Sequence, residues 1–205
     1  RLVKEGWSVT VVDDMSNGHL ELLEGLDFRV VPDAGLYESF MQAASDQNTF
    51  TDKTVIVIQD DFANQRVLSL VSGGEYDVVF HQAAVPRVSY SVEHPTETTD
   101  VNITKTVALF EASRNSVDRV VWASSSSVYG GADELPTAES EPKNPKSPYA
   151  WQKSAIEDVA KMFGDLYDLD IVCLRYFNVF GPGQYGDSPY STAVSAWCNN
   201  TKFMK

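Results

Sequence analysis

Short runs of Val, Ile and Leu recur along the chain, and longer stretches with helical spacing separate them. Continuous apolar runs are typical of parallel strands that are buried on both faces, whereas strands with one wet face alternate apolar and polar positions. The pattern predicts an α/β fold with a doubly wound, Rossmann-like parallel sheet. The expected strands are residues 8–12, 54–58, 76–80, 119–123 and 170–177.

Helix boundaries are marked by residues that commonly start or stop helices. Gly6 follows a helical end at residues 1–5 and occupies a position where positive φ carries no steric cost for glycine. Ser147 is a good N-cap before Pro148, so we expect a helix that begins there and runs to about residue 167. Further helices are expected at residues 64–71, 95–115 and near 192–199.

Residues 19–48 are harder to order from the pattern alone. They combine a short apolar run at 28–31 with helical spacing at 37–44. The chain shows no internal repeat and no low-complexity segment. We therefore predict one continuous α/β arrangement and leave this region without a committed order.

The composition of the 205 residues is that of an acidic globular protein, with 43% hydrophobic and 22% charged residues and a net charge of −13. Such a charge repels polyanions, so nucleic acid and anionic membrane surfaces are not expected as partners. We find no apolar run of membrane-spanning length and no signal peptide, which predicts a soluble, cytoplasmic protein. Cys173 and Cys198 lack CxxC spacing, so neither a disulfide framework nor a metal site is expected.

Tyr149 and Lys153 are the sharpest chemical pair in the sequence. Four residues separate them at the start of the predicted helix, so both side chains rise from one face. A nearby ammonium lowers the pKa of a phenol from about 10, and a cationic nicotinamide would lower it further, which would make Tyr149 a base. Taken alone, the spacing is common, and a lysine on a solvated helix face explains it better.

The position of Ser125 supports a catalytic interpretation of the Tyr149–Lys153 pair. Ser125 follows the strand predicted at 119–123, and ligands of doubly wound sheets bind outside the carboxyl ends of the strands. A serine there can donate to a substrate oxygen and relay a proton to the tyrosine. Four consecutive serines, 124–127, more often form a turn that satisfies its own backbone. Together, however, Ser125, Tyr149 and Lys153 predict a catalytic set.

Carboxylates at strand ends suggest a nucleotide. Asp13 ends the first expected strand, where a carboxylate can accept hydrogen bonds from both hydroxyls of a ribose. The same carboxylate would repel a 2′-phosphate, which favours NAD over NADP. The alternative is an Asp that caps the following turn. Asp61 could accept from an adenine amino group, whereas adjacent Asp60 and Asp61 point to opposite sides and make a poor metal pair. The histidines, His19, His81 and His94, are scattered and do not support a Ser–His–Asp triad.

Several separate blocks resemble the extended short-chain dehydrogenase/reductases, in particular the nucleotide-sugar epimerase/dehydratase group. Asn102 matches the asparagine of the family's helix. The other matching blocks are VVDDMSNG (11–18), DDFAN (60–64), HQAAVPRVSYSVEHP (81–95), SSSSVYG (124–130), SPYAWQK (147–153) and LRYFNVFGP (174–182).

The resemblance implies a tightly held NAD. It assigns Tyr149 as the base, Lys153 as the anchor of the nicotinamide ribose and Ser125 as the hydroxyl partner. The implied cofactor contacts are Asp13, Asn17, Asp61, Phe62, Ala83, Ala84, Asn102, Tyr149, Lys153 and Tyr176. The implied substrate contacts are Val88, Ser125, Ser126 and Asn178, of which Asn178 would touch the diphosphate.

The implied reaction is epimerisation of a nucleotide sugar, a UDP-hexose, at C4 through a 4-keto intermediate. Dehydratases of the group carry an Asp or Glu before VYG, whereas this chain has serines there, which favours a 4-epimerase. Asn178 within YFNVFG resembles the UDP-glucose and UDP-N-acetylglucosamine enzymes. A 4,6-dehydratase or reductase on the same scaffold and a non-catalytic NAD-binding-fold protein remain as alternatives. The resemblance also implies a homodimer.

The glycine-rich dinucleotide loop of the family is not found. It should precede the ribose carboxylate by about 20 residues, and too few residues stand before Asp13. We therefore expect an incomplete NAD-binding domain at 1–178 that lacks its first strand, followed by only the beginning of a smaller substrate domain at 179–205. Such a segment should bind NAD poorly and expose apolar strand edges.

Overall fold

The computed structural model describes residues 1–47, 51, 53–131, 134–181, 184, 194, 196 and 197. Cys198 and most of the helix expected near 192–199 lie outside these residues. The chain divides into two compact units: a first unit of Arg1–Asp77 with Ala108–Val117, and a second unit of Val78–Val107 with Asp118–Lys205. The domain boundary predicted after residue 178 stays a prediction.

The first unit contains a parallel sheet of three strands in the order β1-β3-β2. The central strand, β3, is buried at four of its five positions, as expected for a strand covered on both faces. The region that the pattern left unordered supplies the strand β2. The bounds are β1 Thr10–Asp13, β2 Phe28–Val31 and β3 Val55–Gln59.

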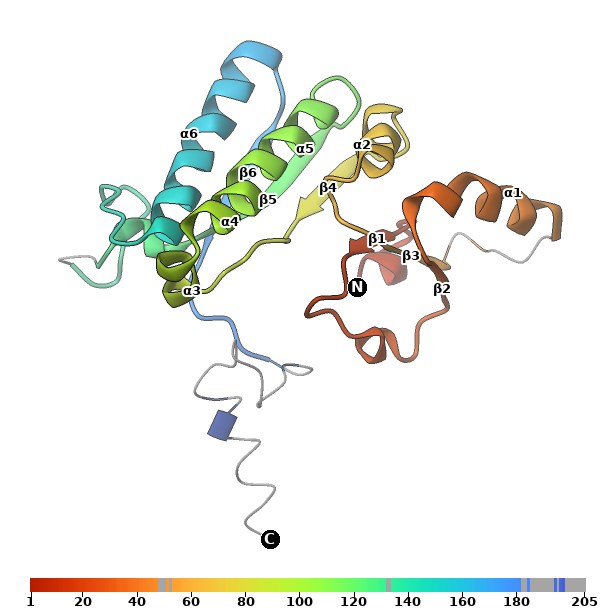
Figure 1. Cartoon of the computed structure of the whole chain (residues 1–205), viewed down its shortest axis with the longest axis horizontal. Helices are drawn as coiled ribbons and strands as arrows, with labels where there is room; N and C mark the ends of the chain where they lie inside the picture. The colour runs from red at the N-terminus through yellow and green to blue at the C-terminus, as the bar shows by residue number, and fades with distance from the viewer. Residues whose placement is uncertain are drawn as a thin grey trace, which may run out of the picture. The chain divides into compact units, whose positions relative to one another are not determined.

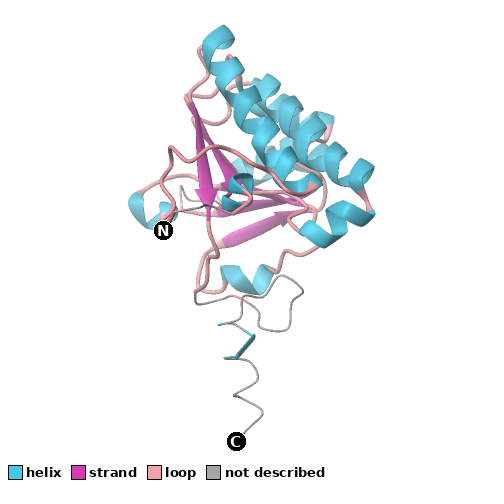
Figure 2. Ribbon diagram, turned by 90° about the vertical axis from the view of Figure 1, so that its left-hand side faces the viewer, coloured by secondary structure: helices cyan, strands magenta, loops and turns pink. Residues whose placement is uncertain are grey.

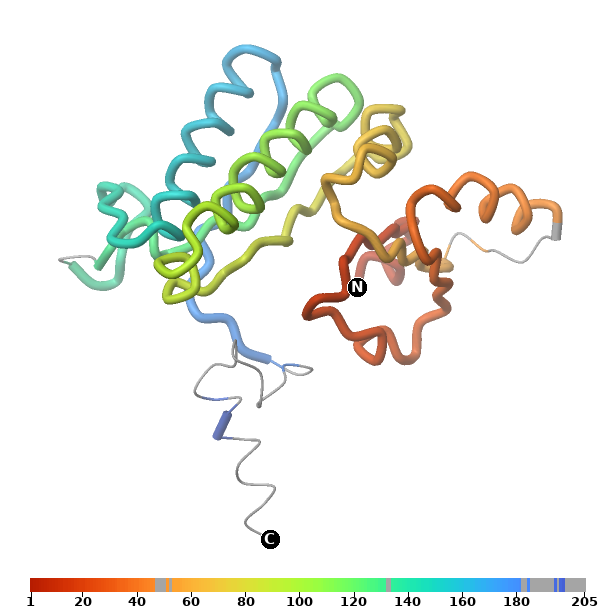
Figure 3. Tube along the Cα trace, in the orientation of Figure 1, coloured from red at the N-terminus to blue at the C-terminus, as the bar shows by residue number. Residues whose placement is uncertain are grey.

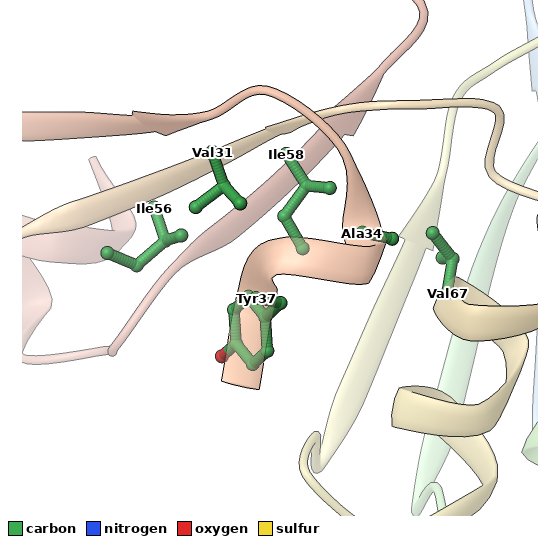
Figure 4. Close-up of a cluster of buried hydrophobic side chains, with 6 residues drawn as sticks. All are labelled: Val31, Ala34, Tyr37, Ile56, Ile58 and Val67. Carbon is green, nitrogen blue, oxygen red and sulfur yellow. The ribbon is translucent and has the colours of Figure 1, made fainter. Parts of the chain in front are cut away.

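The core of the first unit joins this sheet to its helices. Figure 4 shows Val31 and Ile58 side by side, with Tyr37 below them, Ala34 between Ile58 and Val67, and Val67 on the neighbouring helix. Asn64 caps that helix by accepting a hydrogen bond from the Arg66 N–H at 2.9 Å. The helical segments are η1 Leu2–Glu5, η2 Leu20–Leu23, η3 Ala34–Leu36, α1 Tyr37–Gln47 and α2 Gln65–Ser72.

The second unit contains another parallel sheet of three strands, in the order β4-β5-β6. A long helix, α6, packs on β5 and β6 and also against α3 and against α4, Pro95–Thr99 (Figure 1). The short α3 did not stand out in the sequence, because its six residues carry no clear apolar stripe. The bounds are β4 Val78–His81, α3 Val88–Glu93, β5 Arg119–Ser125, η5 Ser126–Tyr129, α6 Pro148–Tyr167 and β6 Ile171–Tyr176.

The single helix expected at 95–115 is helical throughout most of its length but changes pitch in the middle. It consists of α4 Pro95–Thr99, a π-helical turn η4 Asp100–Lys105 and α5 Thr106–Ser113. π-Helical turns occur often at functional sites, and this one carries the buried Asn102.

The predicted α/β, Rossmann-like class is confirmed, with parallel strands and helices between them (Figure 2). The one difference is that the strands form two sheets of three instead of a single sheet. Among the described residues, β1 and β4 each pair with one neighbour only, so each lies at the edge of its sheet. No helix in the described part of the chain has the length and apolarity to cross a membrane.

Candidate active site

The site forms where β5 ends and α6 begins. Ser147 accepts a hydrogen bond from the Ala150 N–H at 3.1 Å and Pro148 takes the first helical position, as the sequence predicts. This start places Tyr149 in the first turn and Lys153 one turn later. Both side chains are buried, with exposed fractions of 8% and 3%.

Lys153 is held at the strand end. Its Nζ donates to the Ala123 carbonyl at 2.7 Å and lies 4.6 Å from the centroid of the Trp122 ring. The same nitrogen lies 5.8 Å from the centroid of the Tyr149 ring, so the ammonium and the phenol share one environment. Burial lowers the pKa of Lys153 to about 8.

Tyr149 differs from the expectation in one respect. Burial raises the pKa of Tyr149, and a hydrogen bond with Ser125 acts in the opposite direction. The lowered pKa expected from Lys153 is therefore not found, because removal of the phenol from water outweighs the favourable contacts. The backbone is fixed as well, since the Tyr149 N–H donates to the buried Ser91 Oγ at 3.1 Å.

The serine cluster combines both interpretations drawn from the sequence. Ser125 Oγ accepts from the Ser127 N–H at 3.2 Å and from the Ser127 hydroxyl at 2.9 Å, as a turn-forming serine would. The same Ser125 hydrogen-bonds Tyr149. Ser124 is used differently, because its Oγ donates to Glu157 Oε1 at 2.6 Å.

A cavity of about 260 Å³ brings the predicted catalytic set together. Its lining residues are Gln82, Ala84, Pro86, Ala123, Ser124, Ser125, Tyr149, Lys153, Tyr176 and Phe177. A larger cavity of about 1190 Å³ runs along β6, but Ser125, Tyr149 and Lys153 do not line it. We place the site in the smaller cavity, because acid–base chemistry needs those groups within reach of a reacting atom.

The other residues predicted in the second unit take varied positions. Ala84 and Tyr176 line the cavity, whereas Ala83 is exposed in the segment after β4. Asn102 is buried, and its side-chain amide hydrogen-bonds to protein groups, namely the Val85 backbone and Gln152. Three predicted substrate contacts remain at or near the surface: Val88 begins α3, Ser126 begins η5 and Asn178 follows β6.

In the first unit, Asp13 ends β1 and accepts from the Met15 N–H at 2.7 Å through Oδ1. A Cβ at Gly18 would come within 2.6 Å of that oxygen, so glycine lets the turn close on the carboxylate. Asn17 is exposed in this turn.

After β3, Asp61 Oδ1 accepts from the Ala63 N–H at 2.8 Å, and Phe62 beside it is half-buried. The adjacent Asp60 bonds the Ala34 N–H at 3.0 Å and Asn64 Nδ2 at 3.0 Å, so it holds the fold together. No group of metal-binding side chains occurs among the described residues.

Each unit, taken by itself, carries a group that suits part of a nicotinamide dinucleotide. Asp13 Oδ2 makes no hydrogen bond within the described residues, which leaves it able to accept from a ribose hydroxyl beside a glycine turn. Lys153 Nζ uses one hydrogen bond on the protein and can donate others to a second ribose. The cofactor roles of the individual residues remain predictions.

Two polar residues of α6 that lie beside the site, and do not line its cavity, were not singled out from the sequence. Glu157 lies one turn beyond Lys153 on α6, and its carboxylate pairs with Arg175 through both Oε1 at 2.9 Å and Oε2 at 2.7 Å. Gln152 is completely buried beside Lys153. The four-residue spacing of Tyr149, Lys153 and Glu157 was a usable signal for Glu157, whereas no local pattern marks Gln152.

A parallel α/β fold with a tyrosine and a lysine at the head of a helix, beside a strand-end serine, defines a short-chain dehydrogenase/reductase type of protein. The chain belongs to the NAD dependent epimerase/dehydratase family, whose model matches residues 1–202.

Similar proteins include both branches of that family. The chain is 35% identical over 186 residues to the UDP-glucose 4-epimerase of Mycolicibacterium smegmatis, covering 90% of this chain and 52% of the relative. It is 33% identical over 147 residues to the human dTDP-D-glucose 4,6-dehydratase, covering 71% and 42%.

The fold of the chain is similar to that of a solved structure. The chain resembles the UDP-N-acetylglucosamine 4-epimerase of Methanobrevibacter ruminantium M1, in complex with UDP-N-acetylmuramic acid, with a TM-score of 0.78 and 32% identity. The match covers 97% of this chain and 56% of that one. The chain thus spans about half the length of the relatives that it matches.

Proposed function

We propose that the protein epimerises a nucleotide sugar, a UDP-hexose, at C4 with the help of NAD. The observation that carries this proposal is the convergence of Ser125, Tyr149 and Lys153 on one cavity at the carboxyl end of β5. An epimerase of this kind needs a group that takes the proton of the 4-hydroxyl and returns it, and the Tyr149–Ser125 pair can do both.

In this proposal Ser125 donates a hydrogen bond to the sugar oxygen while Tyr149 removes the hydroxyl proton. When bound, NAD would supply a reversible hydride acceptor for C4, and inversion requires that the 4-keto sugar turn over before it takes the hydride back, so that the net redox change is zero. Lys153 donates to the ribose beside the phenol and stabilises negative charge on the Tyr149 oxygen. The closed surroundings of Lys153 and Tyr149 keep water away from both groups.

The main alternative is a 4,6-dehydratase, since a relative of that activity matches the chain. Elimination of water from the sugar requires an acid or base beyond the tyrosine. Among the described residues that line the cavity there is no Asp or Glu, and serines stand where a carboxylate would be needed. This lining supports the epimerase. The intact catalytic set likewise speaks against a non-catalytic binding protein.

We further infer a cytoplasmic homodimer for the full-length protein. Three large apolar side chains on α6, Trp151, Met162 and Leu166, are 53%, 44% and 65% exposed, and their spacing places them on one side of the helix. A Leu166→Glu variant should sediment as a monomer in analytical ultracentrifugation. Unchanged sedimentation would contradict this interface.

The test of the function is a substrate panel. Full-length protein is incubated with UDP-glucose, UDP-N-acetylglucosamine and UDP-glucuronate, and the C4 epimers are resolved by chromatography. We expect the interconversion of at least one pair without net NADH accumulation. Formation of a 4-keto-6-deoxy sugar would show the dehydratase instead, and the absence of any conversion by NAD-loaded protein would contradict the proposed UDP-hexose epimerase.

A further inference from the structure

Gln152 is a completely buried amide whose hydrogen-bonding groups all have protein partners. Its Nε2 donates to Thr98 Oγ1 and to Thr99 Oγ1, both at 3.0 Å. Its Oε1 accepts from Asn102 Nδ2 at 2.8 Å. An amide buried without such partners is strongly unfavourable, so this residue is matched to the α4 and η4 segments that surround it.

Asn102 carries the contact from Gln152 to the segment that follows β4. Its Oδ1 accepts from the Val85 N–H at 2.8 Å, and its Nδ2 donates to the Val85 carbonyl at 3.1 Å. Because Nδ2 has two hydrogens, one serves Val85 and the other serves Gln152. Gln152 thereby fixes the rotation of the Asn102 amide, and that rotation decides whether Val85 is bonded at both of its backbone groups.

The segment held in this way belongs to the cavity. Residues 82–87 run between β4 and α3 without regular secondary structure, as the chain trace shows (Figure 3). Ala84 and Pro86, on either side of Val85, line the cavity with Tyr149 and Lys153. Since Gln152 directly precedes Lys153 on α6, the bonded Gln152–Asn102 pair connects the catalytic helix to the segment that contributes Ala84 and Pro86 to the cavity lining.

We propose that Gln152 is a positioning residue: through Asn102 it holds residues 84–86 at the distance from Tyr149 and Lys153 that the nicotinamide end of NAD requires. The expected effect on NAD binding rests on the proposed function. The coupling of Gln152 to Val85 does not, because all of its hydrogen bonds lie within the protein. The role proposed for Gln152 differs from that of a residue that contacts NAD directly, because the buried Gln152 amide bonds to protein groups only.

The first test measures the coupling without any ligand. Amide hydrogen exchange is followed at Val85 in wild type and in Gln152→Met, which keeps the side-chain length but removes the acceptor for Asn102. We expect exchange at Val85 to become about tenfold faster in the variant, in line with the loss of one buried hydrogen bond. Exchange at Val85 that matches wild type would overturn the proposal.

The second test measures the consequence. The dissociation constant for NAD is determined by calorimetry and should rise about tenfold in Gln152→Met. Gln152→Glu keeps an oxygen that accepts from Asn102, so its affinity should stay within about threefold of wild type. In an Asn102→Ala background, Gln152→Met should add less than about twofold, because the path to Val85 is already broken. A full tenfold loss in that background would contradict the path.

A matched control separates positioning from general destabilisation. Ser113 is fully buried, and its hydroxyl donates to the Leu109 carbonyl at 2.8 Å within α5, remote in sequence from residues 82–87. Ser113→Ala should lower the melting temperature without changing Val85 exchange or NAD affinity, and equal effects in both variants would overturn the proposal. If Gln152→Met does not fold, Gln152→Asn, which withdraws the oxygen from Asn102, takes its place with the same expectations. If wild type binds no NAD, the proposed function fails while Val85 exchange still decides the coupling.

Discussion

The turns that follow β1 and β3 in the first unit differ from the Asn102–Gln152 contacts on η4 and α6 in the second unit. In the first unit, Asp13, Asp61 and Asn64 each accept from a backbone N–H two residues further along the chain. In the second unit, Asn102 and Gln152 bond to residues between 17 and 54 positions away, and both are buried. These first-unit bonds build local turns, while Asp60 beside them also accepts from the Ala34 N–H 26 positions away, whereas the Asn102–Gln152 network exists only once the fold has formed.

This difference indicates where substitutions should act. A local turn leaves part of each carboxylate facing outward for a ligand and costs little to alter. A buried network leaves donors or acceptors unsatisfied when one member is removed, which is costly. We therefore expect large effects on stability from the second unit and smaller, ligand-specific effects from the first.

The largest expected effect comes from Glu157. Its carboxylate bonds Arg175 twice and also accepts from Ser124, and the Arg175 guanidinium helps to hold the pKa of Glu157 below its ordinary value even though burial opposes this. Glu157→Leu should lower the free energy of unfolding by about 3 kcal/mol, because Arg175 is left without its partner. Chemical denaturation at neutral pH measures this change.

The pH dependence of the same pair gives a second observable. A carboxyl group with a lowered folded pKa adds stability above its unfolded pKa and loses it as the pH falls through the folded value. The stability difference between wild type and Glu157→Leu should therefore shrink on acidification below about pH 4.5. A difference that stays constant down to pH 3 would show that packing, and not charge, accounts for the loss.

Substitution of Lys153 should change the free energy of unfolding in the opposite direction. Its folded pKa of about 8 lies below the ordinary 10.5, so the buried ammonium disfavours folding at neutral pH. Lys153→Met should raise the free energy of unfolding by about 2 to 3 kcal/mol at pH 7, while the proposed activity is lost.

That gain should disappear with rising pH. Between pH 8 and 10.5 the unfolded chain still binds the proton that the folded chain has released, so wild type becomes more stable. Urea titrations at pH 7, 9 and 10.5 follow the difference. A gain that is equal at all three values would refute the burial of the charge as its cause.

Gly18 tests the ligand-facing side of the first unit. A Cβ there would meet Asp13 Oδ1 at 2.6 Å, so Gly18→Ala must displace the carboxylate. NAD affinity should fall about tenfold, as expected when one charged hydrogen-bond acceptor for a ribose is misplaced, while stability changes little. Calorimetric titration checks the affinity, and Gly164→Ala, where a Cβ would make only an ordinary contact at 3.6 Å, is the control at a glycine whose φ, like that of Gly18, is not positive. Unaltered affinity in Gly18→Ala would remove Asp13 from the cofactor site.

The smallest effect belongs to the cap of α2. Asn64 accepts from the Arg66 N–H and its Nδ2 donates to Asp60 Oδ1 at 3.0 Å, so Asn64→Ala should cost about 1 to 2 kcal/mol, as expected for a lost N-cap and one further hydrogen bond. The melting temperature reports it. If this local substitution cost as much as Glu157→Leu, the contrast between the two units would not hold.

The sequence allowed much of the fold and the centre of the site to be predicted. The start of α6 at Pro148 was readable because Ser147 and Pro148 act on neighbouring backbone groups, and the strands were readable from their apolar runs. Ser125, Tyr149 and Lys153 line one cavity because a strand end and a helix start meet there, and their catalytic roles stay predictions.

Other features could not be found in this way. The direction of the Tyr149 pKa was expected wrongly, since it depends on how deeply the fold buries the phenol. The hydrogen-bond partners of Gln152 lie in a helix about fifty positions earlier in the chain, so no local sequence spacing predicts them. The π-helical turn was missed for the same reason, because propensity does not distinguish it from an ordinary helix.

The most direct test of the account is the rate of C4 epimer formation by Tyr149→Phe, which removes only the phenolic oxygen. NAD affinity is measured on the same preparation to show that the site is intact. If Tyr149 moves the proton, the rate should fall by roughly 10² to 10⁴ while NAD still binds within about threefold of wild type. A variant that binds NAD and epimerises the sugar at the wild-type rate would contradict the role of Tyr149 and, with it, the proposed site.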